Sequence, residues 1–168
     1  MTNLANPYAE QLGDRPAREV IAETPQQLRS LLVELSPDGL ELTYGPGKWT
    51  ARMILCHLAD CEICFGFRLR QTLAEEHHVI QPFDQEAWAQ QYGNHSLQAR
   101  AAVEVFGTLR AWNLALIDNL SSESWSKPVR HPERGEMTFR TIVETMGGHD
   151  LNHRRQLETI AAGRASRV

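Results

Sequence analysis

The longest uninterrupted helical pattern of the chain covers residues 51–76, ARMILCHLADCEICFGFRLRQTLAEE, and contains no proline. Its apolar residues recur every three or four positions, which is the period of an amphipathic α-helix. They are Ile54, Leu55, Leu58, Phe65, Leu69 and Leu73, whereas Arg52, Arg68, Arg70 and Gln71 mark its more polar parts. Thr50 precedes the run and is placed to cap its N-terminus. A helix of about seven turns with so wide an apolar face needs other helices to cover it.

Three further segments carry the same period. The first is expected to begin at Thr24, with Pro25 in the first turn and Gln27 completing a capping box, and to end before SPDG. The second begins near Ser96 and ends near SSES, and the third begins after Thr138 as its N-cap. Four amphipathic helices with no convincing strand predict an all-α four-helix bundle.

The remaining segments suggest one domain with irregular connections. Residues 1–20 form a polar leader, and residues 21–168 form the bundle domain, a size that suits a single hydrophobic core. FDQEAWAQQYG, between residues 77 and 95, is either a short helix or an aromatic flap. Prolines and a glycine in WSKPVRHPERGE make a regular helix unfavourable there.

Charge and cysteine content exclude several classes of protein. The net charge is -4 and the 17 Lys and Arg are scattered, which does not suit nucleic-acid binding. No apolar run approaches the roughly 20 residues that span a bilayer, so we expect no membrane association and a cytoplasmic location. The cysteines Cys56, Cys61 and Cys64 are an odd set within one short segment, which fits a reducing compartment better than a disulfide framework.

The segment GGHDLNHRRQLE carries the strongest chemical signal. His149 and His153 are four residues apart and lie on the apolar stripe of the last predicted helix. Side chains at this spacing differ by about 40° around the helix axis, so both imidazoles can reach one ion. Two buried imidazoles without partners would be costly, and a metal ion takes one nitrogen from each.

His57 supplies a third ligand from the second predicted helix, where it stands three residues after Ile54 on the inward face. Three histidines leave a coordination position for water or substrate, which is typical of catalytic metal sites. We therefore predict a divalent metal site of His57, His149 and His153. The alternative for His57 is a hydrogen-bonded core histidine. Cys61, four residues later, is either a fourth ligand or a small buried hydrophobic residue.

The segments GKWTARMILCHLADCE and RTIVETMGGHDLNHRRQLE resemble the DinB-like superfamily of metalloenzymes, which includes bacillithiol- and mycothiol-dependent transferases. The resemblance covers about residues 20 to 162. It implies a four-helix bundle, commonly a homodimer, with a divalent metal held at the positions of His57, His149 and His153. This chain departs from the family pattern in its first twenty residues and in the cysteines around His57.

The resemblance implies either of two reactions on a small-molecule substrate, or no catalysis at all. In a hydrolase, the ion lowers the pKa of water from about 15.7 towards about 7, and a carboxylate serves as base. Asp60, Glu62 and Asp150 are the candidates, although each could instead orient a ligand imidazole. In a transferase, a low-molecular-weight thiol attacks an electrophile as its thiolate. Zinc is the leading metal, with nickel or iron as alternatives.

Residues that would bind substrate are less clearly marked. Arg154 or Arg155 could bind a carboxylate of a thiol cofactor, or either could lie on a solvated helix face. Four aromatic residues could line a pocket or cover the core: Trp49, Phe83, Trp88 and Tyr92.

Gly147 and Gly148 are unusual inside a helix, where each costs about 1 kcal/mol relative to alanine. They indicate a close backbone approach or space kept beside the metal. The alternative is a helix break, with Asp150 capping a new segment.

Two rival functions remain. A non-catalytic metal-binding or stress-associated bundle would have its fourth coordination position closed by Cys61 or a carboxylate. A cysteine-based redox protein ranks last, because the cysteines have no basic neighbour except the histidine to lower a thiol pKa.

Overall fold

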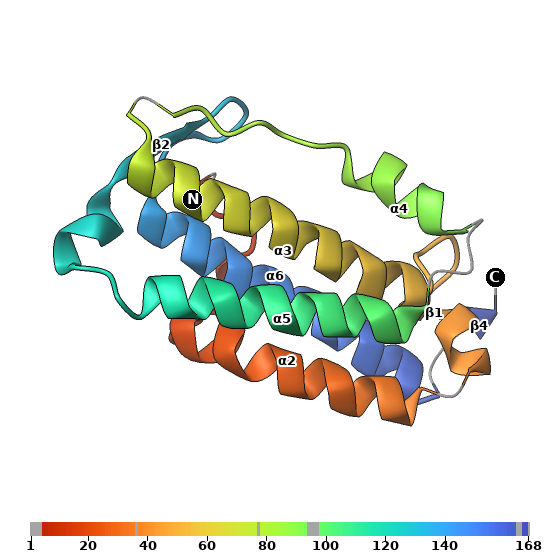
Figure 1. The fold of residues 1–168 in the computed structure, drawn as a ribbon. Coiled ribbons are helices and arrows are strands. Elements are labelled where there is room, and N and C mark those ends of the chain that lie inside the picture. Colours follow the sequence, from red (N-terminus) through yellow and green to blue (C-terminus); the bar gives the residue numbers. More distant parts are fainter. Residues whose placement is uncertain (1–4, 36, 77, 94–97, 164–165, 168) are drawn as a thin grey trace.

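The computed structural model describes residues 5–35, 37–76, 78–93, 98–163 and 166–167. Four long helices lie alongside one another (Figure 1). They are α2 (Ala17–Glu34), α3 (Ala51–Ala74), α5 (Ala99–Ile117) and α6 (Phe139–Ala161). The predicted all-α four-helix bundle is confirmed.

The helices are ordered so that parallel helices are neighbours. Helix α3 packs against α5 and α6, and α2 packs against the same two helices. In Figure 1, α3 and α5 run in one direction and α2 and α6 in the other. A parallel pair needs a long return connection. The segment after α3 provides it, running back along the bundle and carrying α4 (Gln85–Gly93), so the FDQEAWAQQYG segment is mainly a short helix.

Short elements that the sequence pattern did not predict lie before, between and after the four long helices in the chain. They are α1 (Ala9–Leu12), the 3-10 helices η1 (Asp38–Glu41) and η2 (Ser122–Ser126), and the strands β1 (Leu42–Thr43), β2 (Pro128–His131), β3 (Gly135–Thr138) and β4 (Ser166–Arg167). β1 pairs with β4, and β2 pairs with β3 in an antiparallel hairpin before α6. The expectation of no strand is therefore wrong. Pro128 opens β2, a position where its missing N–H is tolerated.

The observed helix starts show which of the predicted N-cap residues do begin a helix. Thr50 accepts a hydrogen bond from the Met53 amide at 3.2 Å, and Thr138 forms a capping box with Thr141, so both predicted caps are confirmed. The predicted start at Thr24 is wrong, because α2 begins at Ala17 and the Thr24 hydroxyl donates to the Val20 carbonyl at 2.9 Å. Pro25 therefore lies inside α2, where a proline removes one hydrogen bond from the helix. The other predicted helix start, Ser96, lies outside the described residues.

Two apolar cores fill the bundle, one towards each end. One includes Leu55 of α3 and Phe106 of α5, and the other includes Leu69 of α3 and Phe139 of α6. Between them lies a set of buried polar side chains, here called the polar layer: His57, Glu62, Arg110, Asn113, His149, Asp150 and His153. Burial of so many polar groups is costly unless they are paired or bind something.

Within the described ranges, none of the helices combines the length and the apolar character that crossing a membrane would require.

Candidate metal centre

The three predicted histidines meet in the polar layer. His57 comes from α3, and its Nε2 lies 3.1 Å from the Nε2 of His149 on α6. The ring of His153, one turn further along α6, is centred 4.8 Å from that of His57 and 4.5 Å from that of His149. Because the spacing along α6 and the inward position on α3 place all three rings together, they form a compact group of imidazoles.

All three imidazoles are neutral at physiological pH. Burial lowers the pKa of His57 to about 3 and that of His153 to about 4, and it lowers the pKa of His149 well below its ordinary value. The Nδ1 of His153 lies 2.8 Å from the Gln156 side-chain oxygen, which can only accept. His153 therefore carries its proton on Nδ1, which leaves a lone pair on Nε2. Neutral imidazoles with a free lone pair are suitable metal ligands.

His149 has an unsatisfied atom. Its Nδ1 is buried and has no hydrogen-bond partner in the part of the chain that the structure describes. Such a group is costly in a well-packed interior, unless the ring is held for another reason. The facing Nε2 atoms of His57 and His149 fit a site for a cation, which would take one nitrogen from each ring.

Cys61 competes with His153 for a place in the site. Its Sγ lies 3.4 Å from the Nε2 of His57, and donor atoms of His57, Cys61 and His149 all lie within 4.8 Å of one another. In this group the thiol takes the place that the sequence analysis gave to His153. Burial raises the pKa of Cys61 well above its ordinary value, so the thiol is protonated in the absence of a cation.

Aromatic rings surround the histidines. Trp49 lies 4.7 Å from the His57 ring and stacks at 6.1 Å on the His153 ring. Tyr8 meets the His149 ring edge-on at 5.2 Å. Tyr8 was not predicted as a site residue, because it lies in the segment taken as a leader. These rings shield the imidazoles from water.

Gly147 and Gly148 accommodate the N-terminal segment. A Cβ on Gly148 would collide with the backbone of Tyr8, and one on Gly147 would lie 3.3 Å from Cα of Ala17. The predicted close backbone approach is confirmed, but its partner is the N-terminal segment and not the metal site. The predicted helix break is wrong, since α6 is continuous from Phe139 to Ala161. The glycines therefore let Tyr8 reach His149.

Two of the candidate carboxylates are engaged by a buried arginine. Asp150 accepts hydrogen bonds from Arg110 at 2.6 and 3.2 Å, and Glu62 accepts one at 2.7 Å. The three side chains are 0–1% exposed. Asp150 thus faces Arg110 of α5, although it is next to His149 in the sequence. Asp60 lies half-buried on α3, and its charge adds to burial in raising the pKa of Cys56.

Arg110 connects all four helices of the bundle. Besides its two carboxylates on α3 and α6, it donates to the Ile21 carbonyl of α2 at 2.8 Å. That carbonyl is free because Pro25, four residues later, has no N–H to donate. Burial alone would lower the pKa of Arg110, but Asp150 and Glu62 raise it above its ordinary value, so the guanidinium stays charged. Its position on the apolar face of α5, between Phe106 and Ile117, was the sequence signal for this role.

Arg154 is placed away from the histidines. Its guanidinium donates to the Gln27 side chain of α2 at 2.8 Å and lies 2.9 Å from the Glu158 carboxylate. His153, by contrast, packs against His57 of α3. Arg155 is exposed. The structure therefore places neither arginine next to the imidazoles.

A cavity of about 540 Å³ reaches the metal centre. Cys61 and His149 line it, together with Tyr8, Phe65, Arg68, Phe83, His131 and Arg134. Of the four predicted aromatic residues, Phe83 lines this cavity and packs at a tilt against Trp88, whose ring centre is 4.8 Å away. Trp49 lines a smaller hollow of about 290 Å³ beside His153. The side chain of Tyr92 lies outside the described residues.

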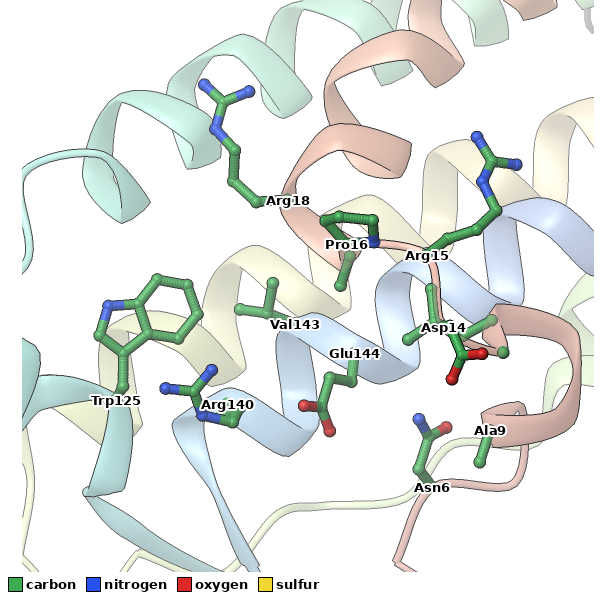
Figure 2. Close-up of a pocket in the computed structure, with 13 residues that line it drawn as sticks. Asn6, Ala9, Asp14, Arg15, Pro16, Arg18, Trp125, Arg140, Val143 and Glu144 are labelled. Atoms are coloured by element: carbon green, nitrogen blue, oxygen red, sulfur yellow. The ribbon is translucent and has the colours of Figure 1, made fainter.

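A separate hollow of about 480 Å³ lies where the N-terminal segment meets the start of α6. Figure 2 shows Trp125, Arg140 and Glu144 along one wall and Asp14, Arg15 and Pro16 along another. None of its lining residues belongs to the cavity beside the histidines. We therefore assign the candidate site to the cavity beside the histidines.

Comparisons with known proteins agree with this fold. The family model described as the DinB superfamily matches residues 21–157. A protein of Oceanobacillus iheyensis, named as a proposed metal-dependent hydrolase, is 27% identical over 133 residues, which cover 79% of this chain and 77% of the relative. YfiT of Bacillus subtilis, named in the same way, is 25% identical over 136 residues, covering 80% and 76%.

The solved structure of YfiT superimposes on this chain with a TM-score of 0.82 at 21% identity, covering 88% of this chain and 85% of YfiT. It is described as having an unusual four-helix bundle topology. The arrangement of the helices is therefore shared between the two proteins.

Proposed function

Because the chain belongs to the DinB superfamily, whose family model matches residues 21–157, we propose that it is a metal-dependent enzyme with His57, His149 and His153 as ligands. The observation that carries this proposal is the meeting of His57 and His149, whose Nε2 atoms lie 3.1 Å apart in a buried layer. The relatives named as metal-dependent hydrolases support it.

The donor set fits a divalent ion of intermediate softness. Neutral imidazoles suit zinc first, with nickel and iron as alternatives. An ion held there supplies Lewis acidity, which polarises a substrate carbonyl and makes water or a thiol more nucleophilic. Gln156 fixes the tautomer of His153, while Trp49 and Tyr8 keep bulk water from the rings.

The two predicted catalytic carboxylates receive different roles. Both oxygens of Asp150 accept from Arg110, so we assign Asp150 as a positioning residue that fixes the turn of α6 carrying His149. Asp60 is half-buried and stands one turn after His57 on α3, and we assign it as the candidate base. Arg154 would bind a thiol cofactor only by leaving Gln27.

Hydrolysis of a small molecule is the first candidate reaction. A low-molecular-weight thiol as cosubstrate, transferred to an electrophile, is the second candidate. The cavity of about 540 Å³ supports the thiol-transfer reaction as a second candidate, because that volume is within the range of pockets that hold drug-sized ligands. A non-catalytic metal-binding protein would instead need Cys61 to close the fourth position.

A homodimer is also proposed. Large apolar side chains are exposed on the neighbouring helices α3 and α5, namely Ile63, Phe67, Val105 and Trp112. Exposed apolar residues on adjacent elements are typical of protein interfaces. Sedimentation velocity of the wild-type protein and of Phe67→Glu tests this, and a monomeric wild type would contradict it. The three free cysteines agree with the predicted cytoplasmic location.

Elemental analysis tests the metal assignment. Wild type, His57→Ala and His149→Ala would be measured as purified, and again after chelation and reloading with zinc. We expect about one ion per chain in wild type and none in the variants. His78→Ala, which changes a histidine outside the polar layer whose side chain is also buried, is the matched control and should keep its ion. Wild type that binds no ion after reloading would refute the proposal.

A further inference from the structure

Arg68 is held in the wall of the cavity beside the metal centre. It stands seven residues after Cys61 on α3, on the same face. Its guanidinium carbon lies 5.9 Å from the ring centres of both Phe65 and Phe83, and it donates to the Gln81 carbonyl at 3.3 Å. The predicted placement of Arg68 at a wetter part of the helix is therefore incomplete, because the side chain is half-buried against two aromatic rings.

Arg134 approaches the same cavity from the hairpin. It lies in the turn between β2 and β3, where its amide donates to the His131 carbonyl at 3.3 Å. Gly135 completes the turn with a φ of 78°, a conformation that favours glycine. The positive charge of Arg134 helps to lower the pKa values of Arg68, His131 and His149, after the larger effect of burial. The two guanidinium groups thus act on the same part of the cavity.

Neither arginine is neutralised by the surrounding protein. No carboxylate in the described part of the chain forms an ion pair with Arg68 or Arg134. Three acidic residues also line the cavity. Asp84 accepts the amides of residues 86 and 87 at the start of α4, Glu86 accepts from the Trp49 indole at 2.9 Å, and Glu133 is exposed. Asp84 and Glu86 therefore already accept hydrogen bonds from groups other than the two arginines.

The rest of the lining determines what else a ligand must contain. Tyr8, Phe65, Pro82 and Phe83 provide apolar surface, and the cavity extends to Cys61 and His149. An arginine without an ion pair beside aromatic rings suits an oxyanion, because guanidinium donates two parallel hydrogen bonds to a carboxylate or phosphate. A ligand with its anionic group on the arginines would extend its apolar part towards His149.

We propose that this cavity binds small molecules with an apolar body and one anionic group, and that Arg68 and Arg134 hold that group. The inference rests on the proposed metal-dependent function and names its class of substrate. It also supplies the carboxylate recognition that the sequence analysis assigned to Arg154. Both arginines are specificity residues, since they lie on the cavity wall and not among the three histidines.

Matched ligands provide the test. Binding of phenylacetate, phenyl phosphate and the uncharged phenylacetamide would be measured by ligand-observed NMR titration of the full-length protein, both zinc-loaded and chelated. We expect each anion to bind at least about tenfold more tightly than the amide, with or without zinc. Preference for one anion over the other identifies which anionic group the site takes.

Variants separate the arginines from the metal. Arg68→Gln and Arg134→Gln should each weaken anion binding by about tenfold and leave amide binding unchanged. Arg155→Gln, at an exposed position on α6, is the control. Thermal unfolding verifies that the variants fold, and Arg68→Lys, which keeps the charge without the planar fork, should recover part of the affinity.

The outcomes distinguish this inference from the proposed function. Equal binding of anions and amide, or anion binding that requires zinc and ignores both arginine variants, would overturn it. If the protein binds no zinc but still prefers the anions through the two arginines, the inference about the cavity is supported. In that case only the proposed metal-dependent function is refuted.

Discussion

The polar layer contains two clusters that differ in how completely their polar atoms are satisfied. Around Arg110, the guanidinium makes four hydrogen bonds to Ile21, Glu62 and Asp150, and only its Nε lacks a partner. Around the histidines, two Nε2 atoms face each other, and the Nδ1 of His149 has no partner among the described residues. In the first cluster, protein atoms alone hydrogen-bond both terminal nitrogens of the guanidinium and balance its charge, whereas the second cluster gains most from a bound cation.

The clusters are adjacent in sequence as well as in space. Cys61 precedes Glu62 on α3, and His149 precedes Asp150 on α6. Consecutive residues on a helix point about 100° apart, so one turn of each helix serves both clusters. The Arg110 cluster therefore holds in place the two turns from which the candidate metal ligands project. A mutation in the first cluster should act on folding, and one in the second on ligand binding.

The largest effect is expected from Arg110→Met. It leaves the Glu62 and Asp150 carboxylates buried without a cation, which should lower the free energy of unfolding by about 3–5 kcal/mol. Urea unfolding with metal removed measures this. Arg18→Met breaks the exposed pair with Asp118 and should cost less than about 1 kcal/mol. Equal losses in the two variants would mean that the Arg110 cluster does not hold the bundle.

Metal binding should have the next largest effect on the free energy of unfolding. This effect should depend only on the cluster around the histidines. Zinc at about 100 times its dissociation constant should add about 2.7 kcal/mol to the free energy of unfolding of wild type. His149→Ala should abolish this gain, and His78→Ala should keep it. Unfolding curves with zinc and with a chelator measure the difference. An equal gain in His149→Ala would place the ion elsewhere.

Acid should destabilise the metal-free protein through its histidines. Burial holds the pKa of His153 at about 4 and that of His57 at about 3, so below pH 6.5 the unfolded chain binds more protons than the folded one. Stability should therefore fall as the pH drops from about 6.5 to about 4. His153→Gln should flatten this slope in urea titrations at stepped pH, and an unchanged slope would contradict the burial of a neutral imidazole.

Cys61→Ser should have the smallest effect, because the proposed site uses three histidines. We expect less than about a tenfold change in zinc affinity, and no intense near-ultraviolet thiolate band in the cobalt-loaded wild type. Cys64→Ser, at a half-buried position on the same cavity, is the control. A cobalt–thiolate band lost in Cys61→Ser but kept in Cys64→Ser would make Cys61 a ligand, and the site a mixed nitrogen and sulfur centre.

Features with a local cause were predictable from the sequence. The caps Thr50 and Thr138 depend on residues within one turn, and the three histidines follow from helical spacing. Thr24 has the same local signal but fails, since the packing of residues 17–23 extends α2 past it. The hairpin was missed because its two strands have only four residues each, too few for a clear alternation of apolar and polar side chains.

Contacts between distant segments were not predictable. Gly148 signalled a close neighbour, but nothing in the sequence identified Tyr8 as that neighbour. Arg110 stood on an apolar face, but its partners come from three other helices. Likewise Arg68 and Arg134 lie 66 positions apart in the printed chain, and only the hairpin brings the second arginine to the cavity.

Pro25 has a consequence for how α2 is aligned along the bundle. Its missing N–H leaves the Ile21 carbonyl as the acceptor for Arg110, at 2.8 Å. A slide of α2 by one turn, about 5.4 Å, would present a carbonyl already bonded within the helix. One imino acid thus fixes the axial register of the first long helix against the other three, by leaving a single gap in its ladder of hydrogen bonds.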